Sequence, residues 1–210
     1  MGAPGTMRHH LANTLQRGLS LIELLVTLSI AVILLTIGVP SFVDMITSNT
    51  ATSYGNDLLA DINYARSEAI TRGMRVVVCK GTATAVNSVC TAGEWEKGWK
   101  VFVDCNDDQT VSNATCPGGL NEEVLRVHAA LSTGWTLRGN NNVTNRITFL
   151  PDGRTNNNST LVVCKDGVVN NERLKAIVLH ITGRARIATD TDNNGTPDEA
   201  DGNEINDCTP

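Results

Sequence analysis

The sequence predicts an α+β protein in which one long N-terminal helix precedes a β-rich head of two antiparallel sheets. Residues 19–39 form an apolar run of 21 residues that contains a single charge. Apolar residues then recur at steps of three and four as far as Arg72, which is the period of a helix that buries one face. From Arg75 onward the chain changes to short segments rich in Val, Ile and Thr that Gly, Asn and Asp separate, a pattern typical of strands and turns.

The chain has 210 residues, with 17 Lys and Arg against 22 Asp and Glu, and therefore a formal net charge of −5. This balance excludes a polybasic nucleic-acid binder at the level of the whole chain. The charge is unevenly distributed, because residues 1–18 carry +2, residues 19–73 carry −3, residues 74–189 carry +3 and residues 190–210 carry −7. The sequence therefore divides into four pieces of different charge.

The apolar run 19–39 is long enough to cross a bilayer as a helix, which requires about 20 residues. The segment before it is basic, so the positive-inside rule predicts a cytoplasmic N-terminus and a periplasmic head. Glu23 lies inside the run, where a carboxylate is costly in lipid and indicates a function with a charged partner. The alternative is that Glu23 reaches the headgroups near the helix end. Pro40 ends the run and should kink the helix or loosen its hydrogen bonds.

The sequence from Gly18 to Glu23, GLSLIE, followed by an apolar helix and Pro40, resembles the class III signal of type IV prepilins and pseudopilins. The resemblance implies that a prepilin peptidase removes residues 1–18 as a leader peptide, by cleaving between Gly18 and Leu19, and N-methylates Leu19. Leu19 departs from the phenylalanine that is usual in the family. The resemblance also implies that Glu23 and Pro40 serve assembly with other pilins or pseudopilins. Glu23 would then neutralise the amine of Leu19 in a neighbouring subunit.

Beyond this membrane and assembly half (19–40), we expect an amphipathic half (41–73) that ends at Gly73, with Asp61 and Arg66 among the polar residues on its other faces. The head then occupies residues 74–210. Eight strand-like segments are expected, at 75–80, 99–105, 123–129, 135–139, 146–151, 160–165, 174–182 and 184–189.

The head carries a second resemblance. The segment from Cys79 to Cys90, the W-x-x-G-W element at 95–99 and the V-F-V-D strand that follows resemble the GspH/FimT branch of type IV pilin-like proteins. The resemblance implies a type IV pilin-like fold. It also implies a minor pilin or pseudopilin, of a type IV pilus or of a type II secretion filament, that starts in the bacterial inner membrane and moves into the filament.

Six cysteines follow the apolar run, and none forms a C-x-x-C pair, so a structural zinc site is not expected. An even number at wide spacing suits disulfides in an oxidising compartment. Two equal spacings of eleven favour the pairs Cys79–Cys90 and Cys105–Cys116. The remaining pair, Cys164–Cys208, would tie the acidic tail (190–210) to the head. Free buried thiols are the alternative.

The chain carries none of the sequence patterns G-x-S-x-G, G-x-x-x-x-G-K or H-E-x-x-H, and His128 and His180 lie in strand-like segments. We therefore expect no enzyme activity and no required cofactor.

The element Gly183-Arg184-Ala185-Arg186 could bind nucleic acid. Alternate residues of a strand share a face, so Arg184 and Arg186 would present two guanidinium groups about 7 Å apart, which suits adjacent phosphates of one DNA strand. Residues 126–189 hold nine bases against three acids, a local charge of +6. A G-R-x-R element also resembles FimT-type minor pilins, which implies non-specific DNA binding in natural transformation. Weaker candidates for the same surface are Gly183, Arg138, Arg146, Arg154 and Lys175.

The acidic tail also matches the spacing of a calcium loop, with Gly195 at the sixth position and an aspartate rather than a glutamate at the twelfth. The candidate calcium ligands are Asp190, Asp192, Asn194, Thr196, Asp198 and Asp201. The alternative is an exposed loop rich in Asp and Asn without an ion.

Two functions therefore remain open at this point. One is a minor pilin whose head binds DNA, and the other is a purely structural subunit at the tip of a secretion filament. The N-terminal helix suits both equally, and the G-R-x-R element distinguishes them.

Overall fold

The computed structural model describes residues 18–82, 85, 87–90, 93–165, 174–191, 197–199, 203–205 and 208. The expected leader peptide, apart from Gly18, lies outside the described residues. The chain divides into two compact units, Met1–Phe42 and Val43–Pro210.

The first unit contains the start of helix α1 (Leu21–Arg72). Ser20 caps this helix, because its Oγ accepts a hydrogen bond from the backbone N–H of Glu23 at 3.2 Å. The helix continues through Pro40 without interruption, and all residues from 18 to 43 are exposed. Among the described residues, α1 is the helix that is long and apolar enough to cross a membrane. Its exposed apolar surface is what a lipid-facing helix requires.

The rest of α1 belongs to the second unit, the head, where it buries one face. The buried positions include small residues at Ala51, Gly55, Ala65 and Ala69, which let the helix lie close to the strands. The helix ends at Gly73, as predicted. This residue has a φ of 62°, and the N–H of the following Met74 donates to the carbonyl of Ala69 at 3.2 Å.

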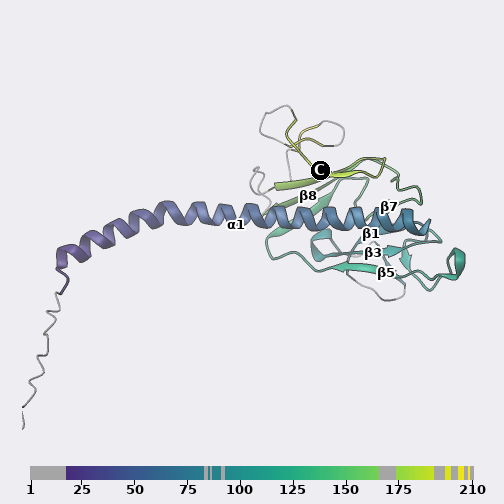
Figure 1. Ribbon diagram of the computed structural model, residues 1–210, viewed down its shortest axis with the longest axis horizontal. Coiled ribbons are helices and arrows are strands. Elements are labelled where there is room, and N and C mark those ends of the chain that lie inside the picture. The colour runs from purple at the N-terminus through teal and green to yellow at the C-terminus, as the bar shows by residue number, and fades with distance from the viewer. Residues whose placement is uncertain are drawn as a thin grey trace, which may run out of the picture. The chain divides into compact units, whose positions relative to one another are not determined.

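Two four-stranded antiparallel sheets and a short ribbon form the rest of the head (Figure 1). The first sheet has the order β5-β3-β1-β7, with β5 at Val124–His128, β3 at Trp99–Val103, β1 at Val76–Lys80 and β7 at Arg146–Phe149. The second sheet has the order β10-β9-β8-β6, with β10 at Ala185–Ile187, β9 at Leu174–Leu179, β8 at Ser159–Lys165 and β6 at Trp135–Gly139. The ribbon pairs β2 (Ser88–Val89) with β4 (Thr110–Val111).

The central strands of both sheets are covered on both faces. Alternate residues such as Val76 and Val78 of β1 join one large core that α1 shares with both sheets. The residues between them, Val77 and Cys79, face a second cluster that includes Val111 of the ribbon. In the same way, the outer face of β8 and β9 is covered by C-terminal residues that include Ile205. This double cover explains why the central strands are apolar along their whole length.

All eight expected strand segments contain a strand, at the bounds given above. Three disulfides, Cys79–Cys90, Cys105–Cys116 and Cys164–Cys208, join the cysteines in the predicted pairs. The ribbon was not predicted from the sequence. Two further elements were not predicted either, namely the short 3-10 helices η1 (Trp95–Lys97) and η2 (Pro117–Gly119).

Candidate functional site

The residues of the expected processing and assembly signal lie at the start of α1. Gly18 and Leu19 are exposed and precede the helix, and Glu23 lies in its first turn. Ser20 and Glu23 stand three residues apart, so this part of the signal also caps the helix. The same short sequence therefore sets where the membrane helix begins and places a carboxylate one turn from that end.

The G-R-x-R element lies at the turn between β9 and β10, and the glycine makes this turn possible. Gly183 has a φ of 78°, and a Cβ atom added there would lie 1.8 Å from the carbonyl oxygen of Gly153. Arg66 of α1 fixes the two turns together, because its Nε donates to that Gly153 oxygen at 3.0 Å and its Nη2 donates to the Thr182 oxygen at 3.4 Å. Gly183 is therefore required by the backbone, and Arg66, expected on a solvent face, instead holds the turn.

Arg184 directly precedes β10, and the strand period places it on the same side as Arg186, with Ala185 and Ile187 on the other side. Ala185 and Ile187 pack against the core that includes α1, whereas both arginines are exposed. Arg186 stands opposite Val178 of β9. Beside the two arginines lies an open groove of about 570 Å³, which Val178, His180, Thr182, Arg184, Ala185 and Arg186 line.

The two arginines have few partners within the head. Arg186 donates weakly from Nη1 to Thr189 Oγ1 at 3.3 Å and to the Ile187 carbonyl at 3.4 Å. The Arg184 carbonyl accepts a hydrogen bond from the N–H of His180 at 2.9 Å, but its guanidinium group makes no hydrogen bond or ion pair within the part of the chain that the structure describes. Neither arginine is paired with a carboxylate of the described residues, so both guanidinium groups present their donors to solvent.

The other basic candidates differ from this pair. Arg138 forms an ion pair with Glu96 of η1, and Arg154 pairs with Asp152 at 2.7 Å. Burial opposes ionisation of Glu96, but the hydrogen bonds from Arg138 and from the backbone outweigh it and lower the pKa of Glu96. Arg146 starts β7 and lines a different groove, and Lys175 lies half-buried on β9. The charge of +6 counted along the sequence therefore overstates the free positive charge of the surface.

Part of the acidic tail lies on the outer face of the second sheet. The disulfide Cys164–Cys208 and the buried Ile205 attach it there. Of the expected calcium ligands, Asp192, Asn194, Thr196 and Asp201 lie outside the described residues. Asp190 lies in the described part, as does Asp198, which is 7% exposed and accepts a hydrogen bond from the N–H of Thr191 at 2.8 Å. The calcium loop of the tail remains a prediction.

One polar network was not predicted from the sequence. Asp61 of α1, expected on a solvent face, is 4% exposed. Its Oδ2 accepts a hydrogen bond from Trp99 Nε1 at 2.8 Å, and its Oδ1 pairs with Arg126 Nη1 at 2.6 Å. Trp99 in turn stacks on His128, with ring centroids 3.8 Å apart, so this histidine is a packing residue. The helical period predicted a solvent-exposed Asp61, and this prediction was wrong. Asp61 is buried because Trp99 of the W-x-x-G-W element places its indole N–H against this face of the helix.

Comparison with known proteins gives two family matches. The family described as type II transport protein GspH matches residues 55–183. The prokaryotic N-terminal methylation motif matches residues 13–39. No curated protein matches the chain significantly.

Two solved structures are similar to this chain at low sequence identity. The type IV minor pilin FimU of Pseudomonas aeruginosa has a TM-score of 0.48 and 18% identity over 67% of this chain and 90% of that chain. The minor pseudopilin EpsH of the type II secretion system of Vibrio cholerae has a TM-score of 0.40 and 14% identity over 65% of this chain and 94% of that chain.

Proposed function

Because the chain belongs to the GspH family, we propose that this minor pilin or pseudopilin binds DNA without sequence preference through Arg184 and Arg186 of its head. The observation that carries the proposal is the pair of exposed guanidinium groups on one face of β10, which have no acidic partner in the described residues. Each group is a planar fork of donors that suits a phosphate. Their separation along the strand, about 7 Å, suits two neighbouring phosphates.

The position of β10 supports this use. It is the edge strand of its sheet, so nothing in that sheet lies beyond it. Among the described residues, the groove beside the arginines is lined by one histidine and one threonine and by no acidic residue, which favours a polyanion. Contacts of this kind read the phosphate backbone and not the base edges, which is why we expect no sequence preference.

The N-terminal segment supports an assembly role that accompanies DNA binding. The methylation motif covers Gly18, Leu19 and Glu23, which supports cleavage after Gly18, N-methylation of Leu19 and incorporation through Glu23. In this proposal the uncleaved chain sits in the inner membrane with its head in the periplasm, and the mature chain joins other pilins. We assign no catalytic step and no required cofactor to the chain. The structural alternative, a tip pseudopilin without DNA binding, uses the same helix.

Binding of fluorescent DNA duplexes of unrelated sequence to the full-length chain, in a non-ionic detergent, tests the proposal. Replacing both arginines, R184Q with R186Q, should weaken binding 10- to 100-fold, because each exposed charge-assisted contact contributes about 1 kcal/mol or somewhat more. The slope of log affinity against log salt should fall by about two units. Lysine at both positions should restore part of the affinity, since the charge is kept and the fork is lost.

A matched control removes two charges elsewhere on the head. The pair K97Q and R154Q changes an exposed lysine of η1 and an arginine that already has an acidic partner. This control should bind DNA like the wild-type chain. If the R184Q/R186Q chain and the wild-type chain bind DNA with equal affinity at the same salt concentration, the two arginines do not bind DNA. The chain would then be a purely structural tip pseudopilin.

A further inference from the structure

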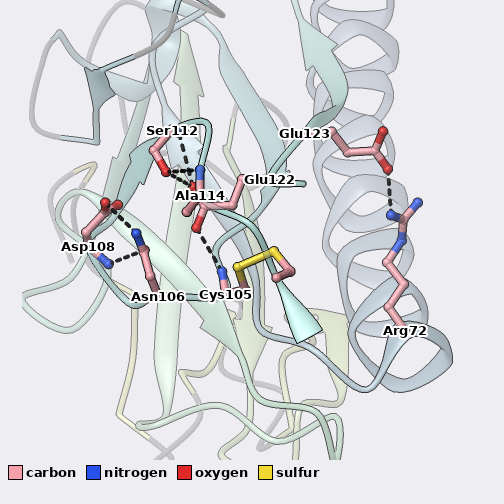
Figure 2. Close-up of a disulfide and its surroundings, with 9 residues drawn as sticks. Arg72, Cys105, Asn106, Asp108, Ser112, Ala114, Glu122 and Glu123 are labelled. Carbon is pink, nitrogen blue, oxygen red and sulfur yellow. Dashed lines mark hydrogen bonds and ion pairs between the residues drawn. A yellow bond between two sulfur atoms is a disulfide. The ribbon is translucent and has the colours of Figure 1, made fainter. Parts of the chain in front are cut away.

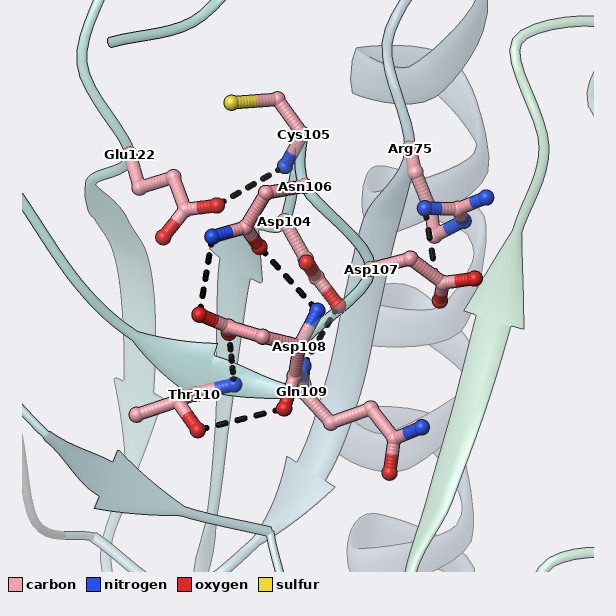
Figure 3. A network of polar contacts seen from close by, with 9 residues as sticks. All are labelled: Arg75, Asp104, Cys105, Asn106, Asp107, Asp108, Gln109, Thr110 and Glu122. Atoms are coloured by element: carbon pink, nitrogen blue, oxygen red, sulfur yellow. Dashed lines mark hydrogen bonds and ion pairs between the residues drawn. The ribbon is translucent and has the colours of Figure 1, made fainter. Parts of the chain in front are cut away.

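A cluster of three carboxylates lies beside the Cys105–Cys116 disulfide, on the opposite sheet from the arginine pair. Asp104 directly follows β3, Asp108 lies in the turn towards β4, and Glu122 lies just before β5. One oxygen of each residue lies within 4.8 Å of the corresponding oxygens of the other two. Figure 3 shows the three side chains converging from these separate segments.

Two of these carboxylates are buried, since Asp104 is 0% exposed and Glu122 is 6% exposed. A buried carboxylate is normally paired with a base or bound to a metal ion. No Lys, Arg or His nitrogen of the described residues lies within 4.0 Å of any of the three carboxylates. The nearest ion pair in the turn joins Arg75 to the neighbouring Asp107 at 3.3 Å. Arg75 therefore acts on Asp104 only from a longer distance, and none of the three acidic groups has an ion pair among the described residues.

Glu122 is held by the protein itself. Its Oε1 accepts a hydrogen bond from the N–H of Cys105 at 3.0 Å, and its Oε2 accepts from the N–H of Ser112 at 3.1 Å and from the Ser112 hydroxyl (Figure 2). Each carboxylate oxygen has two lone pairs, so Oε1 retains an acceptor position. The disulfide joins the two segments that carry Asp104 and Glu122 and fixes their separation.

Asp104 differs, because one of its oxygens has no partner. Oδ2 accepts a hydrogen bond from the N–H of Gln109 at 3.1 Å. Oδ1 is buried and makes no hydrogen bond with the described residues. In Figure 3 the oxygen of Asp104 that has no dashed line lies on the side of Asn106, away from the Gln109 amide. An unpaired buried carboxylate oxygen is costly unless a ligand fills the position.

We propose that Asp104, Asp108 and Glu122 bind a divalent calcium ion that fastens the β3–β4 turn to the segment before β5. All three ligands are hard oxygen donors that lie within 4.8 Å of one another, and Oδ1 of the buried Asp104 has no hydrogen-bond partner among the described residues. Asp108 is exposed, so water can complete the six to eight ligands that calcium takes. Calcium suits the site better than magnesium because its geometry is less strict. Residues Asp104, Asn106 and Asp108 also repeat at the one-three-five spacing of calcium loops.

Calorimetric titration of the full-length chain in non-ionic detergent tests the proposal, after treatment with a chelator and against calcium chloride. The informative variant is Asp108→Asn, because this residue is exposed and an asparagine oxygen can still accept from the N–H of Thr110. We expect the Asp108→Asn chain to bind this calcium ion at least about 10-fold more weakly than the wild-type chain, because asparagine keeps an oxygen ligand but loses the charge. Calcium should also raise the melting temperature of the wild-type chain more than that of the variant at the same concentration. Ions bound by the acidic tail would remain in both chains.

The matched control is Asp107→Asn, which removes the same charge from the same turn. Asp107 has a φ of 63°, a conformation that asparagine also adopts, and its side chain faces Arg75. This control should bind calcium like the wild-type chain. The proposal is overturned by an absence of binding at millimolar calcium, by equal binding in the wild-type and Asp108→Asn chains, or by equal losses in Asp108→Asn and Asp107→Asn. Tighter binding of magnesium than of calcium would overturn the choice of ion.

Discussion

Removing the carboxylate of Asp61 should destabilise the head by about 2–4 kcal/mol. In an Asp61→Ala chain the indole N–H of Trp99, which is 1% exposed, loses its acceptor, and a buried unsatisfied donor costs about 1–3 kcal/mol. The ion pair with Arg126 is lost as well. The side chain of Arg126 is 45% exposed, so solvent screens this pair and its contribution is at most about 1 kcal/mol.

An Asp61→Asn chain separates these two contributions. An asparagine oxygen can still accept the hydrogen bond from Trp99, whereas the charge opposite Arg126 is gone. We therefore expect a loss of about 1 kcal/mol, and an Arg126→Met change should add little to it. Asn63→Gln, at an exposed position of the same helix, is the control and should change stability by less than about 0.5 kcal/mol.

Urea unfolding of the full-length chain in non-ionic detergent, followed by tryptophan fluorescence, measures these differences. Asp61→Ala within about 0.5 kcal/mol of the wild-type chain would refute the argument that the indole hydrogen bond requires this carboxylate. Asn and Ala variants of equal stability would show that the charge, and not the acceptor, is what matters.

Three further predictions follow from the fold. Gly183→Ala should cost at least about 1–3 kcal/mol, because the residue has a φ of 78° and its Cβ would collide with a backbone oxygen; unchanged thermal stability would contradict this. Because the pKa of Glu96 is lowered in the folded chain, the ionised carboxylate stabilises the fold fully when the pH is above its ordinary pKa of 4.5. This stabilisation is lost as the pH falls through the lower pKa of the folded state. The stability difference between the wild-type chain and Glu96→Gln should therefore shrink between pH 6 and pH 3 in urea titrations, and a constant difference would exclude the ion pair with Arg138. Glu23→Ala should leave membrane insertion intact, since it removes a charge costing up to about 3 kcal/mol in lipid, and should abolish incorporation into filaments; wild-type amounts of the variant in sheared filaments would rule out its assembly role.

Local patterns in the sequence predicted the main elements of the fold. The apolar run and the three-four period gave α1 and its end at Gly73, and β-branched segments between turn residues gave eight strands. The equal spacing of cysteines also gave the pairs that the structure contains. Each of these signals is carried by residues that are close together in the chain. The ribbon of β2 and β4 has two residues in each strand, too few to show a period.

The surroundings of charged residues were harder to predict. Arg126 and Arg138 pair with acids that precede them by 65 and 42 residues. The net charge counted over residues 126–189 therefore did not include these acidic partners. The cluster of Asp104, Asp108 and Glu122 needs a turn, a disulfide and a strand to bring its members together. Its local signal, the alternation of Asp104, Asn106 and Asp108, was present in the sequence, but the longer acidic pattern of the tail drew the calcium prediction there.

The buried face of α1 also determines how the head responds to force. Ala51, Leu58, Ile62, Ala65 and Ala69 are each 0% exposed, and together they span about 27 Å of the helix axis, at 1.5 Å per residue. Tension along that axis loads these contacts in shear, so they must yield together and not one after another. Many small contacts that break at the same moment resist a pull far better than the same contacts opened in sequence. A subunit drawn by its helix would therefore keep both sheets attached until the whole interface slides.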